Sequence, residues 1–334
     1  MSSSMLEHLA RGVLALSHLA GAARAIPPYP KEAQYVLDLI VRECLHSGLT
    51  PPSSLPELIG WCVDLTASGR EPIRGVDLIV QSLVHPVQRV RTRTCTEVGG
   101  WSAVSDRIVA EVVADIPDEE ARRRRAVLAS HVLITSETSR TVLMKDPRMI
   151  PALKAVKDCY LPAPEEWIVR GKIALCPTCG LLARSEHPDY ELVSWCETET
   201  CPRRTRITNR VSASSALVLH PALRLYHVLP ARTEQILLTG LKTAHVVAHP
   251  SGDHHGCYTI RAPNPAVIRV YDRIEPGPLA RDSLVDKVDI AVVPQLDGEF
   301  RKMFQEALPG GAEVLIRTVD EIFEILTGSG KEFR

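Results

Sequence analysis

The sequence predicts an α+β protein of several domains, with a helical N-terminal domain over residues 1–162, a central four-cysteine ribbon over 163–222 and a C-terminal α/β sandwich over 223–334. Three observations support this prediction. Apolar residues recur at helical spacing in the first domain, four cysteines stand in two close pairs in the second, and short apolar runs alternate with helical patterns in the third. A chain of 334 residues is long enough for two or three domains.

Composition limits the classes of function. Hydrophobic residues make up 45% of the chain, so a sizeable core can be buried. The 39 Lys and Arg residues nearly balance the 40 Asp and Glu residues, which leaves no global basic field that would attract nucleic acid. Any nucleic-acid surface must therefore be a local patch.

The compartment is predicted from the apolar runs and the cysteines. No run of about 18 apolar residues is present, so we expect no membrane span. Glu7, His8 and Arg11 interrupt the apolar pattern near the N-terminus, which argues against a secretion signal. The nine cysteines are odd in number, and five of them are scattered without a pairing pattern. A reducing, cytoplasmic compartment fits these features best.

The first domain is predicted to be a series of helices. Apolar residues recur every three or four positions over residues 6–19, and a second helix is expected over Lys31–His46. A third begins at Ser54, where Glu57 three residues later gives the pattern of a capping box. Further helical patterns cover residues 103–115, 118–134 and 151–160.

Two cysteine pairs have the spacing of a metal-binding ribbon. Strand-like runs at Ile168–Leu175 and Glu191–Trp195 lead into C-x2-C and C-x4-C, with 16 residues between the pairs. Gly180 follows the first pair, where a knuckle favours a residue without a Cβ. Four thiolates complete the tetrahedral shell of Zn²⁺ and leave no position for water, so we expect structural zinc, with an iron–sulfur centre as the alternative. The predicted ligands are Cys176, Cys179, Cys196 and Cys201.

Three basic clusters are candidates for contact with phosphates. One is the run 122–125 in a predicted helix, for which the alternatives are a solvated face and pairing of some members with the acidic residues 118–120. In another, Arg89, Arg91 and Arg93 alternate, so that they would share one face of an extended segment. The third directly follows the ribbon, and its alternative interpretation is a solvated loop or contact with the protein's own acidic groups. The nucleic-acid-binding residues predicted in this third cluster are Arg203, Arg204, Arg206 and Arg210.

The last 110 or so residues alternate between helices and strands in the order α-β-β-β-α-β-α-β-α, which indicates an α/β sandwich with a mixed sheet. The helices are expected at Thr233–Leu241, Pro278–Asp286, Glu299–Leu308 and Val319–Leu326. The strands are expected at His245–Ala248, Cys257–Arg261, Val267–Tyr271, Val288–Val293 and Glu313–Arg317.

The order α-β-β-β-α-β is the core of restriction-endonuclease-like folds, whose chemistry uses a divalent metal such as Mg²⁺. Their acidic ligands lie on two adjacent strands, the second within an Asp/Glu-x-Lys motif. Glu234 on the first helix and Asp253 before the second strand fit acidic positions. Arg269-Val270-Tyr271 stands where the motif belongs, and Asp272 lies one position beyond it, on the other face of a regular strand. We therefore expect cleavage to be weak or absent.

Several stretches resemble a bacterial family, the restriction-endonuclease-like component of the three-gene prokaryotic PIWI–RE conflict system, in the PD-(D/E)xK superfamily. In the N-terminal part these are Tyr-Pro at 29–30 and Gly-Leu-Thr-Pro-Pro-Ser-Ser-Leu-Pro-Glu-Leu-Ile-Gly-Trp-Cys at 48–62. In the C-terminal part they are Leu-Pro-Ala-Arg-Thr-Glu at 229–234, His-Pro-Ser-Gly-Asp at 249–253, Val-Tyr-Asp-Arg-Ile-Glu-Pro-Gly-Pro-Leu-Ala-Arg at 270–281 and Val-Val-Pro-Gln at 292–295.

This resemblance implies a PIWI-like protein and a DinG-type helicase as partners, and action on invading DNA or RNA–DNA hybrids. The catalytic positions of the family fall on Glu234 and Asp253, and Asp272 matches the acidic residue after the lysine. Arg269 and Tyr271 depart from the family pattern.

Three functions follow as alternatives: a nuclease-like, nucleic-acid-binding component of a defence system, an active metal-dependent DNA endonuclease with a rearranged site, and a zinc-ribbon regulatory protein that binds DNA. The sequence favours the first. A further group of possible metal ligands, for which an incidental cluster is the alternative, comprises His249, His254, His255 and Cys257.

Overall fold

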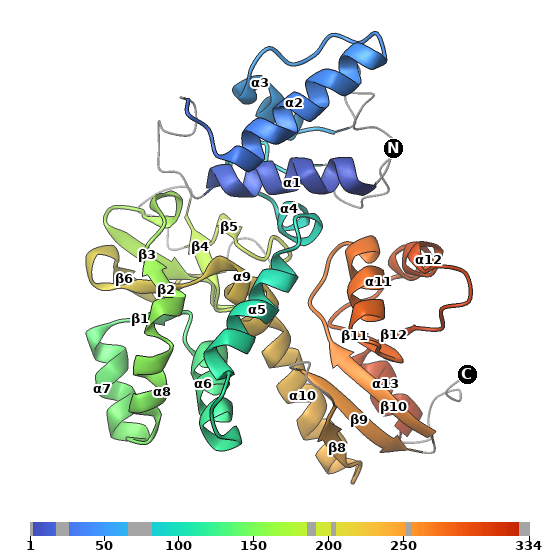
Figure 1. Cartoon of the computed structure of the whole chain (residues 1–334). Helices are drawn as coiled ribbons and strands as arrows, with labels where there is room; N and C mark the ends of the chain where they lie inside the picture. Colours follow the sequence, from blue (N-terminus) through green and yellow to red (C-terminus); the bar gives the residue numbers. More distant parts are fainter. Residues whose placement is uncertain are drawn as a thin grey trace. The chain divides into compact units, whose positions relative to one another are not determined.

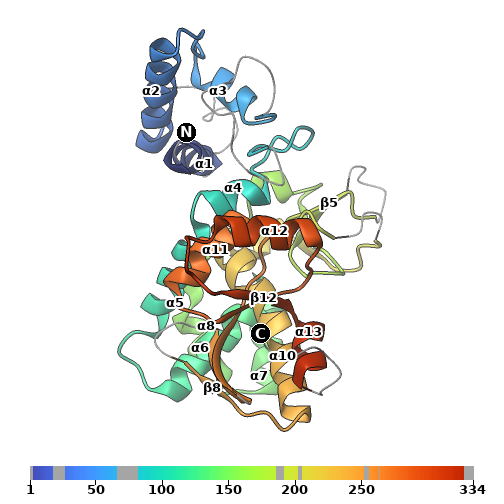
Figure 2. The same cartoon turned by 90° about the vertical axis from the view of Figure 1, so that its right-hand side faces the viewer.

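The structure, a computed structural model, describes residues 3–17, 27–65, 82–185, 192–201, 205–251, 256–262 and 264–326 (Figure 1, Figure 2). The chain divides into two compact units, Met1–Ser102 and Ala103–Arg334. The fold is α+β, with helices and three separate sheets in the described part of the chain. The finer division into three domains stays a prediction.

The first unit is helical where it is described, and its two long helices pack closely. α1 (Ser3–Ser17) contacts α2 (Lys31–His46), which has the predicted bounds. A Cβ at Gly12 of α1 would lie 2.6 Å from Cγ1 of Val36. The two backbones can therefore approach this closely because position 12 carries no side chain. The buried residues of α2 are Ala33, Val36, Ile40 and Cys44.

α3 (Leu55–Trp61) begins after Ser54 as predicted. The Ser54 hydroxyl accepts a hydrogen bond from the N–H of Glu57 at 3.4 Å. The second half of the predicted capping box is formed one residue earlier than expected. The Glu57 carboxylate accepts from Ser53, from its N–H at 2.7 Å and from its hydroxyl at 2.6 Å. These hydrogen bonds lower the pKa of Glu57.

The prediction that Arg89, Arg91 and Arg93 share one exposed face is wrong. The chain enters α4 (Arg93–Val98) at Arg93, whose side chain is buried with its Nε 3.4 Å from the Glu97 carboxylate. The Arg91 guanidinium instead packs over the Trp101 ring, 4.6 Å from its centroid, and Arg89 is exposed. A buried guanidinium needs a carboxylate partner, which the i,i+4 spacing of α4 provides.

The second unit starts with helices α5 to α8. The arginine run lies on α6, and its first three members pair with acidic residues one turn earlier. Arg122 lies 2.7 Å from Glu119, and Arg124 lies 3.1 Å from Glu120. For these arginines the alternative of pairing within the helix is therefore confirmed. The bounds of the helices are α5 Trp101–Val113, α6 Asp118–Ser130, α7 Ser136–Lys145 and α8 Met149–Ala155.

A small antiparallel sheet, ordered β1-β7-β2, joins segments that are distant in sequence. Its strands are β1 (Leu133–Ile134), β2 (Tyr160–Pro162) and β7 (Leu217–Leu219). Val218 in the central strand is opposite Leu133 on one side and Leu161 on the other. The ribbon region therefore leaves from β2 and returns at β7, two strands that are hydrogen-bonded neighbours.

The ribbon forms a four-stranded antiparallel sheet ordered β5-β4-β3-β6. The predicted strand Ile168–Leu175 is shorter than expected, because Arg170 and Gly171 adopt positive φ and form a tight turn before β3. The predicted strand at Glu191–Trp195 is reduced to its end, and Glu191 lies outside the described residues. The strands are β3 Lys172–Leu175, β4 Leu182–Arg184, β5 Trp195–Cys196 and β6 Arg210–Ser212.

The C-terminal part has the predicted element order around one mixed sheet, ordered β12-β11-β10-β9-β8. β8, β9 and β10 form an antiparallel meander, whereas β10, β11 and β12 run parallel. The strands are β8 Ala248–Pro250, β9 Cys257–Ala262, β10 Asn264–Val270, β11 Ile290–Val293 and β12 Leu315–Thr318.

Helices cover both faces of this sheet (Figure 1). Leu237 of α10 and Ile322 of α13 pack on one face, and Leu279 of α11 and Phe304 of α12 pack on the other. Between α9 and α10 the chain forms one π-helical turn, Arg224–Val228, which continues directly into α10. No helix in the described part of the chain has the length and apolarity that a membrane span requires. The helices are α9 Pro221–Leu223, α10 Leu229–Thr243, α11 Pro276–Val285, α12 Gly298–Ala307 and α13 Val319–Leu326.

Candidate metal centre and buried charge cluster

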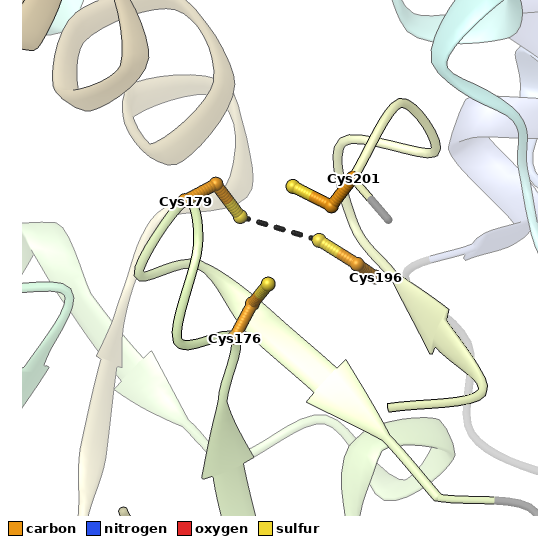
Figure 3. A group of neighbouring side chains, drawn as sticks. All are labelled: Cys176, Cys179, Cys196 and Cys201. Carbon is orange, nitrogen blue, oxygen red and sulfur yellow. Dashed lines mark hydrogen bonds between the residues drawn. The ribbon is translucent and has the colours of Figure 1, made fainter. Parts of the chain in front are cut away.

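The four predicted ligand cysteines converge on one point (Figure 3). Their Sγ atoms all lie within 4.8 Å of one another, and Sγ of Cys179 is 3.2 Å from Sγ of Cys196. A zinc ion with Zn–S bonds of about 2.3 Å places its sulfurs about 3.8 Å apart, so the cluster has the dimensions of a tetrahedral site. The four cysteines can hold a metal ion such as zinc, and four thiolates leave no open coordination position.

The thiols already share hydrogen bonds within the cluster. Hydrogen bonding from Cys179 lowers the pKa of Cys201, and hydrogen bonding with Cys196 lowers the pKa of Cys176. The Thr198 hydroxyl also donates to Sγ of Cys201 at 3.1 Å. Hydrogen bonding within the cluster thus favours the thiolate, the form of cysteine that binds metal, at Cys176 and Cys201. Hydrogen bonding with Cys176 instead raises the pKa of Cys196, so the charge is unevenly shared among the four thiols.

The first knuckle is closed by Gly180. Its N–H donates to the carbonyl of Cys176 at 2.8 Å, and its φ of +70° is one that L side chains rarely adopt. A Cβ at this position would overlap the guanidinium of Arg232 on α10. The knuckle therefore needs glycine for its backbone conformation, whereas the exposed Arg232 side chain could move aside for a Cβ.

The second knuckle contains a buried ion pair. Glu197, which follows Cys196, accepts hydrogen bonds from Arg224 Nε at 2.8 Å and Nη2 at 2.6 Å. Arg224 Nη1 also donates to the carbonyl of Leu219 at the end of β7. Both knuckles thus contact the continuous helical segment from Pro221 to Thr243.

The predicted phosphate-binding arginines are only partly described. Arg206 has an exposed side chain, and its backbone forms an isolated antiparallel β-bridge with Leu192. Arg210 is exposed at the start of β6. Arg203 and Arg204 lie outside the described residues. The patch therefore stays a prediction.

Glu234, a candidate catalytic residue, lies on α10 and accepts a hydrogen bond from the Tyr258 hydroxyl on β9. Burial raises the pKa of Glu234, while the Tyr258 hydrogen bond and the charge of Arg269 lower it. A Cβ at Gly256 would be 3.8 Å from Oε2 of Glu234. The carboxylate therefore lies beside Gly256, which directly precedes β9 and follows Asp253 by three residues. Asp253 itself lies outside the described residues.

Arg269 lies at the end of β10, close to this region, and has two carboxylate partners. Its Nη1 is 2.6 Å from Asp286, and its Nη2 donates to Asp106 at 3.0 and 3.2 Å. Burial opposes the charged form, but the carboxylates of Asp106 and Asp286 raise the pKa of Arg269. The Tyr271 hydroxyl donates to the same Asp286 carboxylate. Both residues that replace the Asp/Glu-x-Lys motif are therefore engaged with Asp286.

Asp272, the third candidate, follows the end of β10 and is half-buried. Its carbonyl accepts a hydrogen bond from Arg273 at 3.3 Å. Of the predicted His/Cys group, Cys257 is buried against Tyr271 and burial raises its pKa to about 11, whereas His249 is exposed on β8. His254 and His255 lie outside the described residues.

Sequence reasoning missed the partners of the buried arginines. Asp106 precedes Arg269 by 163 positions, and Glu197 precedes Arg224 by 27. An arginine within an apolar strand pattern, such as Arg269 between Ile268 and Val270, does signal that a carboxylate must be near. The sequence contains no signal for which carboxylate this is.

Residues 5–147 match the family model described as the pPIWI_RE three-gene island domain Y. The match includes the stretch at 48–62 quoted above and ends before the ribbon. No curated protein and no solved structure matches the chain.

Proposed function

We propose that this chain, a member of the pPIWI-RE three-gene system through the domain Y in residues 5–147, is a nuclease-like, nucleic-acid-binding component of a prokaryotic defence system. Membership of that system implies a role in defence. The proposal adds that the C-terminal part resembles a restriction endonuclease and that it cuts nucleic acid weakly or not at all.

The arrangement of the C-terminal sheet supports a nuclease-like origin. Helix α10 precedes the antiparallel meander β8-β9-β10, and α11 connects β10 to the parallel strand β11. This is the order expected for a restriction-endonuclease-like core. Glu234 on the helix lies beside Gly256, directly before β9, which supports assigning the acidic groups of such a core to this part of the sheet.

The observation that carries the proposal of weak cleavage is the position of Arg269. Its guanidinium lies between the Asp106 and Asp286 carboxylates, so that a permanent cation stands where a metal-binding carboxylate belongs. At about 4 Å and an effective dielectric near 20, each unit of charge on a metal ion would be repelled by about 4 kcal/mol. The Asp106 and Asp286 carboxylates offset part of this repulsion, but both are engaged by Arg269 and are therefore poor ligands for a divalent ion.

A direct test incubates the purified protein with single-stranded, duplex and RNA–DNA hybrid substrates in Mg²⁺ and in Mn²⁺. We expect binding without robust cleavage. Arg269→Asp combined with Tyr271→Lys restores the motif, and this variant should gain Mn²⁺-dependent cleavage. Arg269→Asn with Tyr271→Lys is the control that lacks the new carboxylate. If neither the wild type nor any variant binds nucleic acid, the proposed function is wrong.

An active endonuclease with a rearranged site is the second candidate. It is favoured by the contact of Glu234 with the start of β9 and by Lys242, which lines the same hollow as Glu234 and offers the missing cation. Robust cleavage that both Asp253→Ala and Asp272→Ala abolish would establish this candidate in place of the first.

The remaining proposals concern surfaces and partners. Neutralising Arg203, Arg204, Arg206 and Arg210 together should weaken binding and reduce its salt dependence, by roughly one unit of slope for each lost phosphate contact. Co-purification with a PIWI-like protein and a DinG-type helicase tests the predicted assembly. A protein that binds DNA and neither partner would instead fit a zinc-ribbon regulator.

A further inference from the structure

A hollow lies between α6 and the helical segment that continues into α10, and it belongs to none of the predicted sites apart from Glu234. Its volume is about 430 Å³, within the range of about 300–1,000 Å³ that is usual for small-molecule sites. One side is formed by α6, which provides Arg125, Ala126 and Ala129. The opposite side is formed by His227 and by residues of α10 that include Glu234, Leu238 and Lys242.

Arg125 differs from the other arginines of its run. Arg122, Arg123 and Arg124 pair with Glu119 or Glu120, whereas Arg125 makes no ion pair with a carboxylate among the described residues. Its Nε atom is buried without a hydrogen-bond partner in the described part of the chain. Burying such a donor without a partner costs free energy, and no described carboxylate balances the positive charge of the Arg125 guanidinium beside the hollow.

The other polar groups of the hollow leave its charge positive. Lys242 is exposed at the opposite side and likewise makes no ion pair with a described carboxylate. Glu234 accepts a hydrogen bond from the Tyr258 hydroxyl. Burial raises the pKa of Glu234, which disfavours the negative charge of its carboxylate. His227 is buried beside the Arg125 carbonyl, at 3.4 Å, and burial lowers its pKa to about 4, so it is neutral at pH 7. The hollow therefore selects an anion.

The walls indicate what else the anion carries. Ala126, Ala129, Ala231 and Leu238 give the hollow small, apolar sides. A guanidinium binds phosphate with two parallel hydrogen bonds, which suits Arg125 better than a single carboxylate oxygen would. In a ligand that joins a flat ring to a phosphate, the phosphate can contact Arg125 and Lys242 while the ring packs against the apolar side chains.

We propose that this hollow binds the phosphate of a nucleotide, either free or at the end of a nucleic-acid strand, between Arg125 and Lys242. The strand form of this proposal rests on the proposed function, since it assigns one contact of the nucleic acid. The free-nucleotide form is independent of it.

The test uses the full-length, metal-loaded protein and measures the affinity for adenosine monophosphate by calorimetry. It also measures the affinity for a short single strand with and without a terminal phosphate by fluorescence anisotropy. The variants are Lys242→Gln, Arg125→Gln and Arg125→Lys. Arg122→Gln is the matched control, because Arg122 lies on the same helix and is exposed and paired with Glu119.

We expect Arg125→Gln and Lys242→Gln each to weaken binding by on the order of tenfold or more, since hydrogen bonds to charged groups are lost. Arg125→Lys should keep part of the affinity, and Arg122→Gln should keep all of it. If only strands with a terminal phosphate respond, the ligand is a strand end; if the mononucleotide responds equally, it is a free nucleotide.

Two results would overturn the proposal. One is unchanged affinity in Lys242→Gln, an exposed position whose substitution leaves the fold intact even if Arg125→Gln does not fold. The other is an equal loss in Arg122→Gln, which would indicate general charge attraction. If the wild type binds strands and these variants bind them equally well, the proposed binding in the hollow is wrong but the proposed function is not. If the wild type binds adenosine monophosphate and no strand, only the proposed function is wrong.

Discussion

Glu197 and Arg224 form a buried, bidentate ion pair that connects the second cysteine knuckle to the helical segment leading into α10. The hydrogen bonds measure 2.6 and 2.8 Å, and the side chains are 5% and 1% exposed, so water screens neither charge. The first knuckle contacts the same helical segment through Gly180 and Arg232. Both knuckles of the cysteine cluster therefore contact the helical segment that carries Glu234.

Breaking this ion pair from one side should be costly. Arg224→Met removes the two hydrogen bonds that the buried Glu197 carboxylate accepts from the guanidinium, and we expect the free energy of unfolding to fall by about 3–5 kcal/mol. Glu197→Gln should behave similarly. The double variant should lose less than the sum of the two, because no charge then remains buried. Urea denaturation measures all three, and Glu119→Gln in the exposed pair with Arg122 is the control, expected to cost below about 1 kcal/mol.

Metal content should equal one ion per chain and depend on the cluster alone. Cys176→Ser should abolish stoichiometric zinc and lower stability by several kcal/mol, because the folding of such ribbons is coupled to metal binding. Cys44→Ser, at a buried cysteine outside the cluster, should keep the metal. Elemental analysis of both variants and of the wild type decides the matter, and a wild type with far less than one zinc per chain would end the idea.

Gly180→Ala tests the contact between the first knuckle and α10. Gly171 serves as a matched control, since both glycines have φ +70° but a Cβ at Gly171 would meet nothing within 4 Å. We expect Gly171→Ala to cost about 1–2 kcal/mol from backbone strain alone and Gly180→Ala to cost slightly more, because the exposed Arg232 side chain must move aside. Adding Arg232→Ala should remove the excess, which thermal unfolding can measure. Equal losses in the two single variants would contradict the close contact.

Glu234 should make stability depend on pH. Because burial raises its pKa, the folded protein holds the proton at higher pH than the unfolded chain does. The stability from this group is full below the unfolded pKa and is lost as pH rises through the folded pKa. The stability of Glu234→Gln relative to the wild type should therefore increase in urea titrations as pH rises above the ordinary pKa of a glutamate, about 4.3.

Tyr258 provides the complementary variant. Its hydrogen bond lowers the pKa of Glu234, so Tyr258→Phe should move the loss of stability to higher pH. A relative stability of Glu234→Gln that does not change with pH would show that this carboxylate titrates alike in the folded and unfolded chain.

The sequence predicts best what local patterns determine. The bounds of Lys31–His46 follow from Pro30 and apolar periodicity, and the cysteine cluster follows from the spacing within each pair. The element order of the C-terminal part is also local information, because each strand and helix carries its own periodicity.

What the sequence leaves undetermined depends on distant partners. β1 and β7 are two and three residues long, too short for an alternating pattern, and they exist because they pair with each other. Arg93 was expected on an exposed face, but its burial with Glu97 depends on how α4 packs. The position of Arg269 in the motif was clear from the sequence, whereas its two carboxylate partners were not.

The order of strands in the small sheet has a consequence for synthesis on the ribosome. β7 is the central strand, and β1 and β2 bond to it and not to each other. Since β7 is made last, both earlier strands have unpaired edges until residue 219 has emerged, a state that exposes nascent chains to misassembly. All four cysteines emerge before then. A ribbon that folds at that stage would draw the end of β2 toward the start of β7 and shorten the loop that must close. We therefore expect the nascent chain to close its sheet sooner when the four cysteines can bind a metal ion.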